Sequence, residues 1–328
     1  MPRRSLQLEY LAQYNALVPR ALELGIRART RSGWRGGREA IRLRVEELQS
    51  LIRQYDLPVS ITGSERTFGV EFEFYLPMGM DRSLLAQRLT EAGISCRAEG
   101  YGHNTRGWWK LVTDGSLNNY ARGSELVSPI LQGEAGLEMV RKALRVLIRE
   151  RCKVNHHCGF HVHVGVKADE ARGYRGETLS FFKNMFRMYK KFEPILDSVL
   201  APSRRLNSNQ WCAPVQFNET NMNDAVRIDQ LQRDYQLQNK YKKLNLMTFW
   251  RQGTIEFRHH QGTVDPLKAD MWIRLVLKMV DAASKKPDAE IAETETSLAS
   301  LLSLVAADTS ETEFFTRRQA HFQQGGRD

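Results

Sequence analysis

Cysteine is scarce in this sequence: four residues in 328, Cys96, Cys152, Cys158 and Cys212, at irregular spacing. So few thiols do not make the framework of a disulfide-stabilised secreted domain, and they are typical of a protein from a reducing compartment. A zinc-binding module is also disfavoured, because the one dense stretch of cysteine and histidine, 152–158, is too tight for an ordinary zinc finger.

Long apolar segments are also absent. No run of 18 apolar residues occurs, so we expect no transmembrane helix. The N-terminus lacks the apolar core of a signal peptide, which predicts a cytoplasmic protein without a membrane partner. The sequence further lacks a Gly-x-x-x-x-Gly-Lys-Ser/Thr loop, so the phosphates of any bound nucleotide would have to be held by metal ions and side chains.

Basic charge is present in excess and is concentrated near the N-terminus. The net charge is +10, and residues 1–66 hold twelve arginines against seven acidic residues. A basic arm of this kind can follow a nucleic-acid backbone, so nucleic acid is one candidate partner. Arginine-rich amphipathic helices are also common solvated surfaces, and both interpretations stay open.

Hydrophobic periodicity divides the chain into three parts. We predict a basic helical N-terminal extension over 1–65, a large domain over 66–284, and a linker, short helix and tail over 285–328. Strands are predicted at 67–76, 94–98, 107–113, 123–128, 159–166, 241–250 and 254–260, and helices at 7–27, 38–55, 83–92, 136–153, 175–200, 222–240, 267–283 and 297–307. Because strands and helices mix without a regular βαβ period, the fold class is α+β with an antiparallel sheet.

Three of these strands carry acids or histidines at alternate positions. The residues are Glu71 and Glu73, then His161 and His163, then Glu256, Arg258 and His260. Alternate side chains of a strand share one face, so the apolar residues between them would face the core. A sheet face with several carboxylates, two histidines and an arginine is costly unless cations bind it. The pattern therefore predicts a site for metal ions and phosphate.

A fourth segment adds carboxylates to this set. An Asp-Gly turn after 108–113 and a returning strand place Asp114 and Glu125 at the ends of a hairpin. Lys110 would lie on the polar face of its strand, within reach of phosphate. Arg204 follows a Pro-Ser turn and could hold a carboxylate or a phosphate, or make a surface salt bridge. A site rich in carboxylates with some imidazole suits Mg²⁺ or Mn²⁺ better than zinc.

Seven motifs in this order resemble the amidoligase family, carboxylate–amine ligases of the group that includes glutamine synthetase and glutamate–cysteine ligase. They are Gly69-Val-Glu71-Phe-Glu73, Asp114-Gly-Ser116, Glu125-Leu-Val-Ser-Pro129, Cys158-Gly-Phe-His161-Val-His163-Val, Pro202-Ser-Arg204, Leu244-Asn-Leu246 and Thr254-Ile-Glu256-Phe-Arg258 with Gly262-Thr263. Each motif alone is unspecific, and their order over roughly 66–283 carries the resemblance.

The resemblance implies a fold and a reaction. The fold is a curved antiparallel sheet, a glutamine synthetase-like saddle, with helices on one face and with ATP and two or three divalent cations on the concave face. The reaction activates a carboxylate as an acyl phosphate, which an amine then attacks to give an amide, ADP and phosphate. The substrate could be an amino acid, a peptide or a modified nucleobase.

The resemblance also implies roles for the site residues. The cation near the substrate carboxylate and the attacking amine is held by Glu71, Glu125 and Asp114. The cation at the nucleotide phosphates is held by Glu73, His161 and Glu256. Arg258 neutralises the transferred phosphoryl group, and His163 lies close to phosphate. An alternative from another class remains: a metal-dependent hydrolase or nuclease that uses the same carboxylates, with the basic arm on nucleic acid.

Overall fold

A computed structural model describes residues 3–24, 26, 38–56, 64–100, 102, 104–115, 117, 122–169, 175–206 and 209–326. One open eight-stranded sheet organises the molecule, in the order β2-β3-β4-β1-β6-β8-β7, with β5 paired to β1. The strands are β1 (Thr67–Tyr75), β2 (Cys96–Ala98), β3 (Trp109–Val112), β4 (Gly123–Val127), β5 (Leu131–Gln132), β6 (Gly159–Gly165), β7 (Leu244–Asn245) and β8 (Thr254–Gln261). Apart from the parallel pair β2–β3, the pairs are antiparallel, so the predicted α+β class is confirmed.

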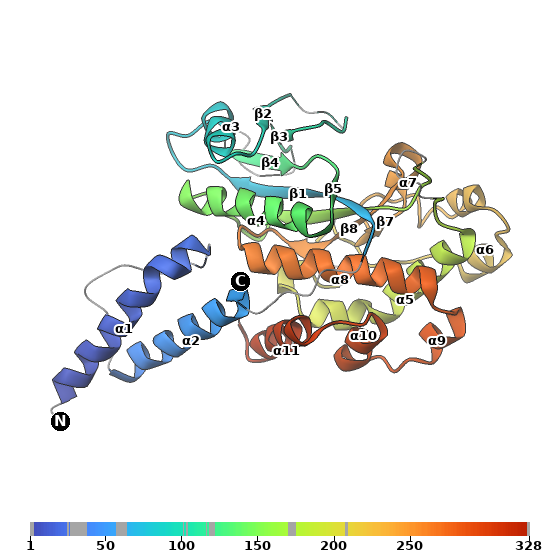
Figure 1. Cartoon of the computed structure of the whole chain (residues 1–328). Coiled ribbons are helices and arrows are strands. Elements are labelled where there is room, and N and C mark those ends of the chain that lie inside the picture. The colour runs from blue at the N-terminus through green and yellow to red at the C-terminus, as the bar shows by residue number, and fades with distance from the viewer. Residues whose placement is uncertain are drawn as a thin grey trace.

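The large helices lie against one face of this sheet. The helices are α1 (Arg3–Glu23), α2 (Arg38–Asp56), α3 (Arg82–Glu91), α4 (Gly133–Arg149), α5 (Leu179–Ser198), α6 (Glu219–Asp224), α7 (Met247–Gln252), α8 (Pro266–Lys285), α9 (Asp288–Glu293), α10 (Leu298–Leu304) and α11 (Thr309–Gln323). Figure 1 shows α4 and α8 running along the sheet, with α10 and α11 beyond α8. Within the described part of the chain, every helix is too short or too polar to cross a lipid bilayer.

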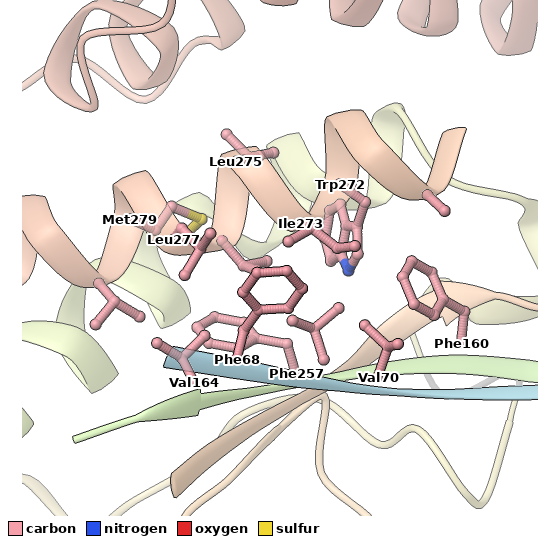
Figure 2. Packing of buried hydrophobic residues seen from close by; sticks show 14 of the residues in the cluster. Phe68, Val70, Phe160, Val164, Phe257, Trp272, Ile273, Leu275, Leu277 and Met279 are labelled. Carbon is pink, nitrogen blue, oxygen red and sulfur yellow. The ribbon is translucent and has the colours of Figure 1, made fainter. Parts of the chain in front are cut away.

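The apolar face of the sheet follows from the alternation seen in the sequence. Phe72 of β1 stacks on Phe160 of β6 with ring centroids 4.4 Å apart. Figure 2 shows Trp272, Ile273 and Leu277 of α8 reaching toward the apolar side chains of the central strands. Burial of such large apolar surfaces is the main stabilising term of the fold. The opposite face of the same strands is left to the polar residues.

A β-bulge in β8 corrects one sequence prediction. Val162 pairs with Phe257 and Phe160 pairs with His260, so one residue of β6 faces two residues of β8. The extra residue reverses the alternation beyond Arg258. His260 therefore lies on the apolar side, edge-on to Phe160 at 5.3 Å, and the prediction that it shares the face of Glu256 and Arg258 is wrong.

Two predicted elements, the helix at 222–240 and the strand at 241–250, are wrong over most of their length. The first holds the end of α6 and a 3₁₀ turn, Ile228–Arg233. In the second, Leu244–Asn245 pairs with β8 and α7 follows at once. The side chain of Asn245 accepts the backbone N–H of Met247 and helps to start α7. Gly253 ends α7 in the left-handed conformation, with φ of 73°.

The N-terminal helices are confirmed as a pair with an apolar core of their own. Tyr14 and Val18 of α1 pack with Val45, Leu48 and Ile52 of α2. Figure 1 shows the pair beside the sheet domain. The arginine-rich stretch 27–37, which carried much of the predicted basic arm, lies outside the described residues. Ser116 of the Asp-Gly-Ser motif does so as well.

The prediction of a linker and a weakly ordered tail after residue 285 is wrong. Three helices, α9, α10 and α11, follow α8, and their apolar residues join the main core, among them Leu301, Leu302, Phe314 and Phe315. Asp308 and Glu311 form a capping box that starts α11. The polar composition of 286–297 led to the prediction of a linker. The spacing Asp308-x-x-Glu311, in contrast, is typical of the start of a helix.

Leu301→Ala tests this packing. Leu301 is fully buried, so the loss of its side chain should lower the free energy of unfolding by about 2–5 kcal/mol in a denaturant titration. Val226→Ala is the control, because Val226 is 77% exposed and should change stability by less than about 0.5 kcal/mol. Equal midpoints for the two variants would mean that α10 is not part of the cooperative core.

Candidate functional site

The polar face of the sheet collects the charged residues because the strand register pairs them. Glu71 pairs with His161 across β1 and β6, and Glu73 pairs with Glu125 across β1 and β4. His163 pairs with Glu256 across β6 and β8. Directly paired residues have their Cβ atoms about 5 Å apart, so residues distant in sequence become neighbours. The four strands thus bring together the acids and histidines that the sequence pattern predicted.

His161 lies at the centre of this cluster. Its Nδ1 is 3.3 Å from Glu71 Oε2 and 3.6 Å from Glu256 Oε1, and its Nε2 is 3.6 Å from Glu73 Oε1. Gly159 makes this crowding possible, since a Cβ atom there would come within 2.7 Å of His161 Nε2. The backbone N–H of Gly159 donates to Glu73 Oε2 at 2.6 Å and anchors that carboxylate.

His163 is the second imidazole of the cluster. Its Nε2 is 3.3 Å from Glu71 Oε1 and 3.8 Å from Glu256 Oε1, while its Nδ1 is 3.2 Å from Thr254 Oγ1. The side chain is therefore oriented by Thr254 toward two carboxylates. His163, Glu71 and Glu256 therefore lie close enough together to bind one cation.

Three groups of residues could each hold a metal ion, because within each group one ligand atom per residue lies within 4.8 Å of the others. They are Glu71–Glu125–His161, Glu71–His163–Glu256 and Glu73–Asp114–Glu125. The three groups contain the six residues predicted as ligands and add His163, which was expected near phosphate. The predicted partition differs: Glu73 is grouped with Asp114 and Glu125, and Glu256 is grouped with Glu71 and His163, although His161 also lies 3.6 Å from Glu256. Sequence reasoning could identify the face but not the distances across it.

The charges of the cluster are unevenly compensated. Burial raises the pKa of Glu125, and the nearby acids Glu71, Glu73 and Asp114 raise it further, well above its usual value. Burial also acts to raise the pKa of Glu71, but His163 and His161 outweigh it and hold that pKa well below the usual range. Negative charge is therefore in excess at the Glu125 end of the cluster, where a bound cation would replace a proton.

Arg258 borders the cluster on β8. Its Nη1 donates to Glu256 Oε1 at 2.5 Å, and its Nε donates to the backbone carbonyl of Trp211 at 3.4 Å. The other oxygen of Glu256 accepts from Asn245 Nδ2 at 2.6 Å. Burial works against the charged guanidinium, but Glu256, Glu73 and Glu71 raise the pKa of Arg258, which stays charged. A fixed positive charge thus lies next to the carboxylates.

Arg204 and Lys110 occupy different positions around the cluster. Arg204 is buried, follows α5 in a 3₁₀ turn and donates through Nη2 to the carbonyl of Arg258, so it is not a surface salt bridge. Lys110 projects from β3 into the cleft, where its ammonium group donates to the backbone carbonyls of Gly102 and Asn104. Lys110 thus lines the cleft, whereas Arg204 is not among its lining residues and bonds to the backbone of β8.

Two cavities meet at the carboxylates. The smaller, of about 680 Å³, contains all three candidate metal groups together with Lys110, Trp211 and Arg258. The larger, of about 990 Å³, extends toward the start of β1 and the end of α8. Glu71 and His163 line both cavities. Each is large enough for a ligand of nucleotide size.

The comparison with protein families covers this site. A family model described as "Putative amidoligase enzyme" matches residues 64–280, which include each strand of the sheet and each residue of the cluster. No curated protein matches the chain.

Behind β8, a buried polar network supports the site, and sequence reasoning missed it. Lys243 Nζ donates to Glu193 at 3.0 Å and to Asp197 at 2.7 Å, both on α5. His259 lies between Asp197 Oδ1, 2.6 Å from its Nε2, and the hydroxyl of Tyr189, 2.8 Å from its Nδ1. Ionised Asp197 accepts from Nε2–H, so the tyrosine hydroxyl donates to Nδ1 and the imidazole is neutral. Strand alternation places His259 on the side of Ile255 and Phe257, facing α5, but its hydrogen-bond partners are distant in the sequence and were not predicted.

Protonation of His259 should make the protein less stable in acid. Burial and Lys243 outweigh the bond to Asp197 and lower the pKa of His259 from 6.5 to about 3. Between these values the unfolded chain binds more protons than the folded protein, so stability is lost as the pH falls through that window. From pH 7 to pH 5 this residue should remove about 2 kcal/mol from the free energy of unfolding.

Denaturant titrations of His259→Gln at both pH values check this prediction, since glutamine can bond to the same partners without titrating. The drop in stability between pH 7 and pH 5 should be smaller in this variant than in the wild type. His156→Gln, at an exposed position, should keep the full drop. An unchanged drop in His259→Gln would show that His259 binds protons equally in the folded and the unfolded protein over this pH range, which contradicts the prediction.

Proposed function

The chain belongs to the amidoligase family, a family of ligase-type enzymes, and we propose that it is an ATP-dependent carboxylate–amine ligase that works through an acyl phosphate with divalent cations. The observation that carries the proposal is the cluster itself. Five carboxylates, two imidazoles and the Arg258 guanidinium converge in one cleft of about 680 Å³. A reaction that brings several phosphate charges together needs this kind of site.

Divalent cations fit the donor set. The three candidate groups offer mainly carboxylate oxygens with one imidazole in each of two, a combination that suits Mg²⁺ or Mn²⁺. The raised pKa of Glu125 reports negative charge that the protein's own cations leave uncompensated. When bound, the cations would neutralise the triphosphate and favour its transfer.

The first step would be carried by position and fixed charge. An oxygen of the substrate carboxylate attacks the γ-phosphorus of ATP, the bond to the β-phosphate oxygen breaks, and ADP leaves. Arg258, oriented by Glu256 and the carbonyl of Trp211, lies where it can stabilise negative charge on the transferred phosphoryl group. Its guanidinium needs no reorganisation, because both contacts already hold it.

The second step would form the amide. The amine nitrogen attacks the acyl carbon, the bond to the phosphate oxygen breaks, and inorganic phosphate leaves. The nitrogen also loses a proton, and we assign its acceptance to the half-buried carboxylates Asp114 and Glu125, at the end of the cluster where negative charge is in excess. The acid and the amine could be free amino acids, peptides or modified nucleobases.

Product analysis across a matrix of acids and amines tests the proposal. ADP should be released at an elevated rate only when a suitable carboxylate and a suitable amine are both present with ATP and Mg²⁺. With ¹⁸O in the substrate carboxylate, one label should pass to inorganic phosphate. Label in AMP with release of pyrophosphate, or hydrolysis of a phosphodiester without ATP, would replace the ligase with an adenylating enzyme or a nuclease.

Glu256→Gln tests the role of the cations. The variant removes one ligand charge while keeping the shape of the side chain, so the affinity for Mg²⁺ in the presence of ATP should fall by at least about tenfold. Calorimetric titration measures this affinity, and ATP binding by the wild type should collapse in EDTA. Glu313→Gln, on an exposed face of α11, is the control. Equal ATP affinity with Mg²⁺ and with EDTA would contradict the assignment.

A further inference from the structure

Two aromatic side chains in the wall of the smaller cleft have no role in the fold or in the reaction as described so far. Trp211 and Tyr241 are half-buried, and their rings meet edge to face with centroids 4.7 Å apart. Both line the cleft that holds the cation cluster. Neither belongs to the main apolar core. Large aromatic rings left partly open at a cleft wall are typical of binding surfaces.

The backbone holds this pair rigidly beside the cluster. Ala213 N–H donates to the carbonyl of Tyr241 at 2.7 Å, and Lys243 N–H donates to the carbonyl of Ala213 at 2.8 Å, so the two segments are joined. The carbonyl of Trp211 accepts from Arg258 Nε at 3.4 Å. The backbone of Trp211 is therefore hydrogen-bonded to Arg258, the arginine that we expect beside the phosphates.

The charges around the pair suit a nucleotide. Lys240 Nζ lies 5.0 Å over the ring of Tyr241, and Arg251 lines the same cleft. The larger cavity offers no equivalent among its described residues: apart from His163, its aromatic residue is Phe68, whose ring packs against Leu131 and Gly136 in the core. Aromatic faces with neighbouring cations bind bases by stacking, with little dependence on the identity of the base.

We propose that Trp211 and Tyr241 form the subsite for the base of the nucleotide whose phosphates lie at the cation cluster. The assignment rests on the proposed function, since it presumes that a nucleotide binds in this cleft. It gives the nucleotide a direction: phosphates at Glu71, Glu256 and Arg258, and the base toward residues 211 and 241. The carboxylate and amine substrates must then approach from the other side of Glu71.

The test compares two ligands that share phosphates and differ in the base. Calorimetric titration with Mg²⁺ measures the affinity of the full-length protein for ATP and for inorganic tripolyphosphate. Trp211→Ala should lower the affinity for ATP by roughly 5- to 150-fold, which is the contribution of one base stacked on one aromatic ring. The affinity for tripolyphosphate should stay within about twofold of the wild-type value. Tyr241→Ala should act in the same direction, and Trp211→Phe should restore most of the affinity.

Trp108→Ala is the matched control. Trp108 is also half-buried and lies under a cation, Arg97, but it bonds to Glu99 and lines neither cavity. Its loss should leave both affinities unchanged. Thermal melting of each variant separates local from global effects.

The outcomes distinguish the two proposals. If wild-type protein binds ATP but Trp211→Ala and Tyr241→Ala bind it equally well, the base subsite is wrong and the proposed function stands. An equal loss of ATP and tripolyphosphate affinity in a folded Trp211→Ala protein would also overturn the subsite, because the tryptophan would then act on the phosphate end. If wild-type protein with Mg²⁺ binds neither ligand, the proposed function fails and the subsite fails with it.

Discussion

Electrostatic repulsion between Glu71, Glu73, Glu125 and Glu256 cannot be relieved by moving the side chains apart, because strand hydrogen bonds hold their backbones in register. Burial removes the water that would otherwise screen the charges. The protein compensates part of the charge with two histidines and Arg258, and it leaves Glu125 with a pKa well above its usual value. On the proposed function, this sheet is a preorganised cation site, and the apolar packing on its other face compensates for the cost of bringing the carboxylates together.

The other face of β8 solves a related problem with different chemistry. His259, the residue after Arg258, points to the opposite side of β8 and is buried against α5, where an imidazole without partners would be costly. Tyr189 and Asp197 satisfy both of its nitrogens, and Lys243 compensates Asp197. Hydrogen bonds thereby join α5 to the residue that follows Arg258.

Much of the site was predictable because strand alternation has a short, strict period. Glu71 and Glu73 must share a face wherever their strand lies, and so must His161 and His163. The order of the motifs along the chain then indicated that these strands belong to one domain. The bulge at 258–260 was not predictable, since it depends on pairing with β6 rather than on local sequence. The division of the cluster into candidate metal groups depends in the same way on side-chain distances between different strands.

The missed elements have a common physical cause as well. The segment 241–250 has residues suited to strands, but the hydrogen bond from the Met247 N–H to the Asn245 side chain and the left-handed Gly253 favour α7 over strand pairing. After residue 285, the helix predicted at 297–307 is confirmed as α10, whereas α9 and α11 were missed. Those two helices pack on α5, and α11 also packs on α8, which compensates for their polar composition. In both places tertiary contacts outweigh local propensity, and such contacts cannot be predicted from local composition.

Residues of strand β1 line both cavities. Glu73 faces the smaller cleft, Glu71 lines both, and Gly69, on the same face, lines the larger cavity. A Cβ atom at position 69 would meet Ser128 Oγ at 3.7 Å and His163 Cβ at 3.9 Å, which is ordinary van der Waals contact. On the proposed function, one strand therefore sets the chemistry at Glu71 and the room for the acid or the amine two residues earlier. On the same proposal, a substitution at position 69 would change the room for the substrate and leave the candidate metal ligands in place.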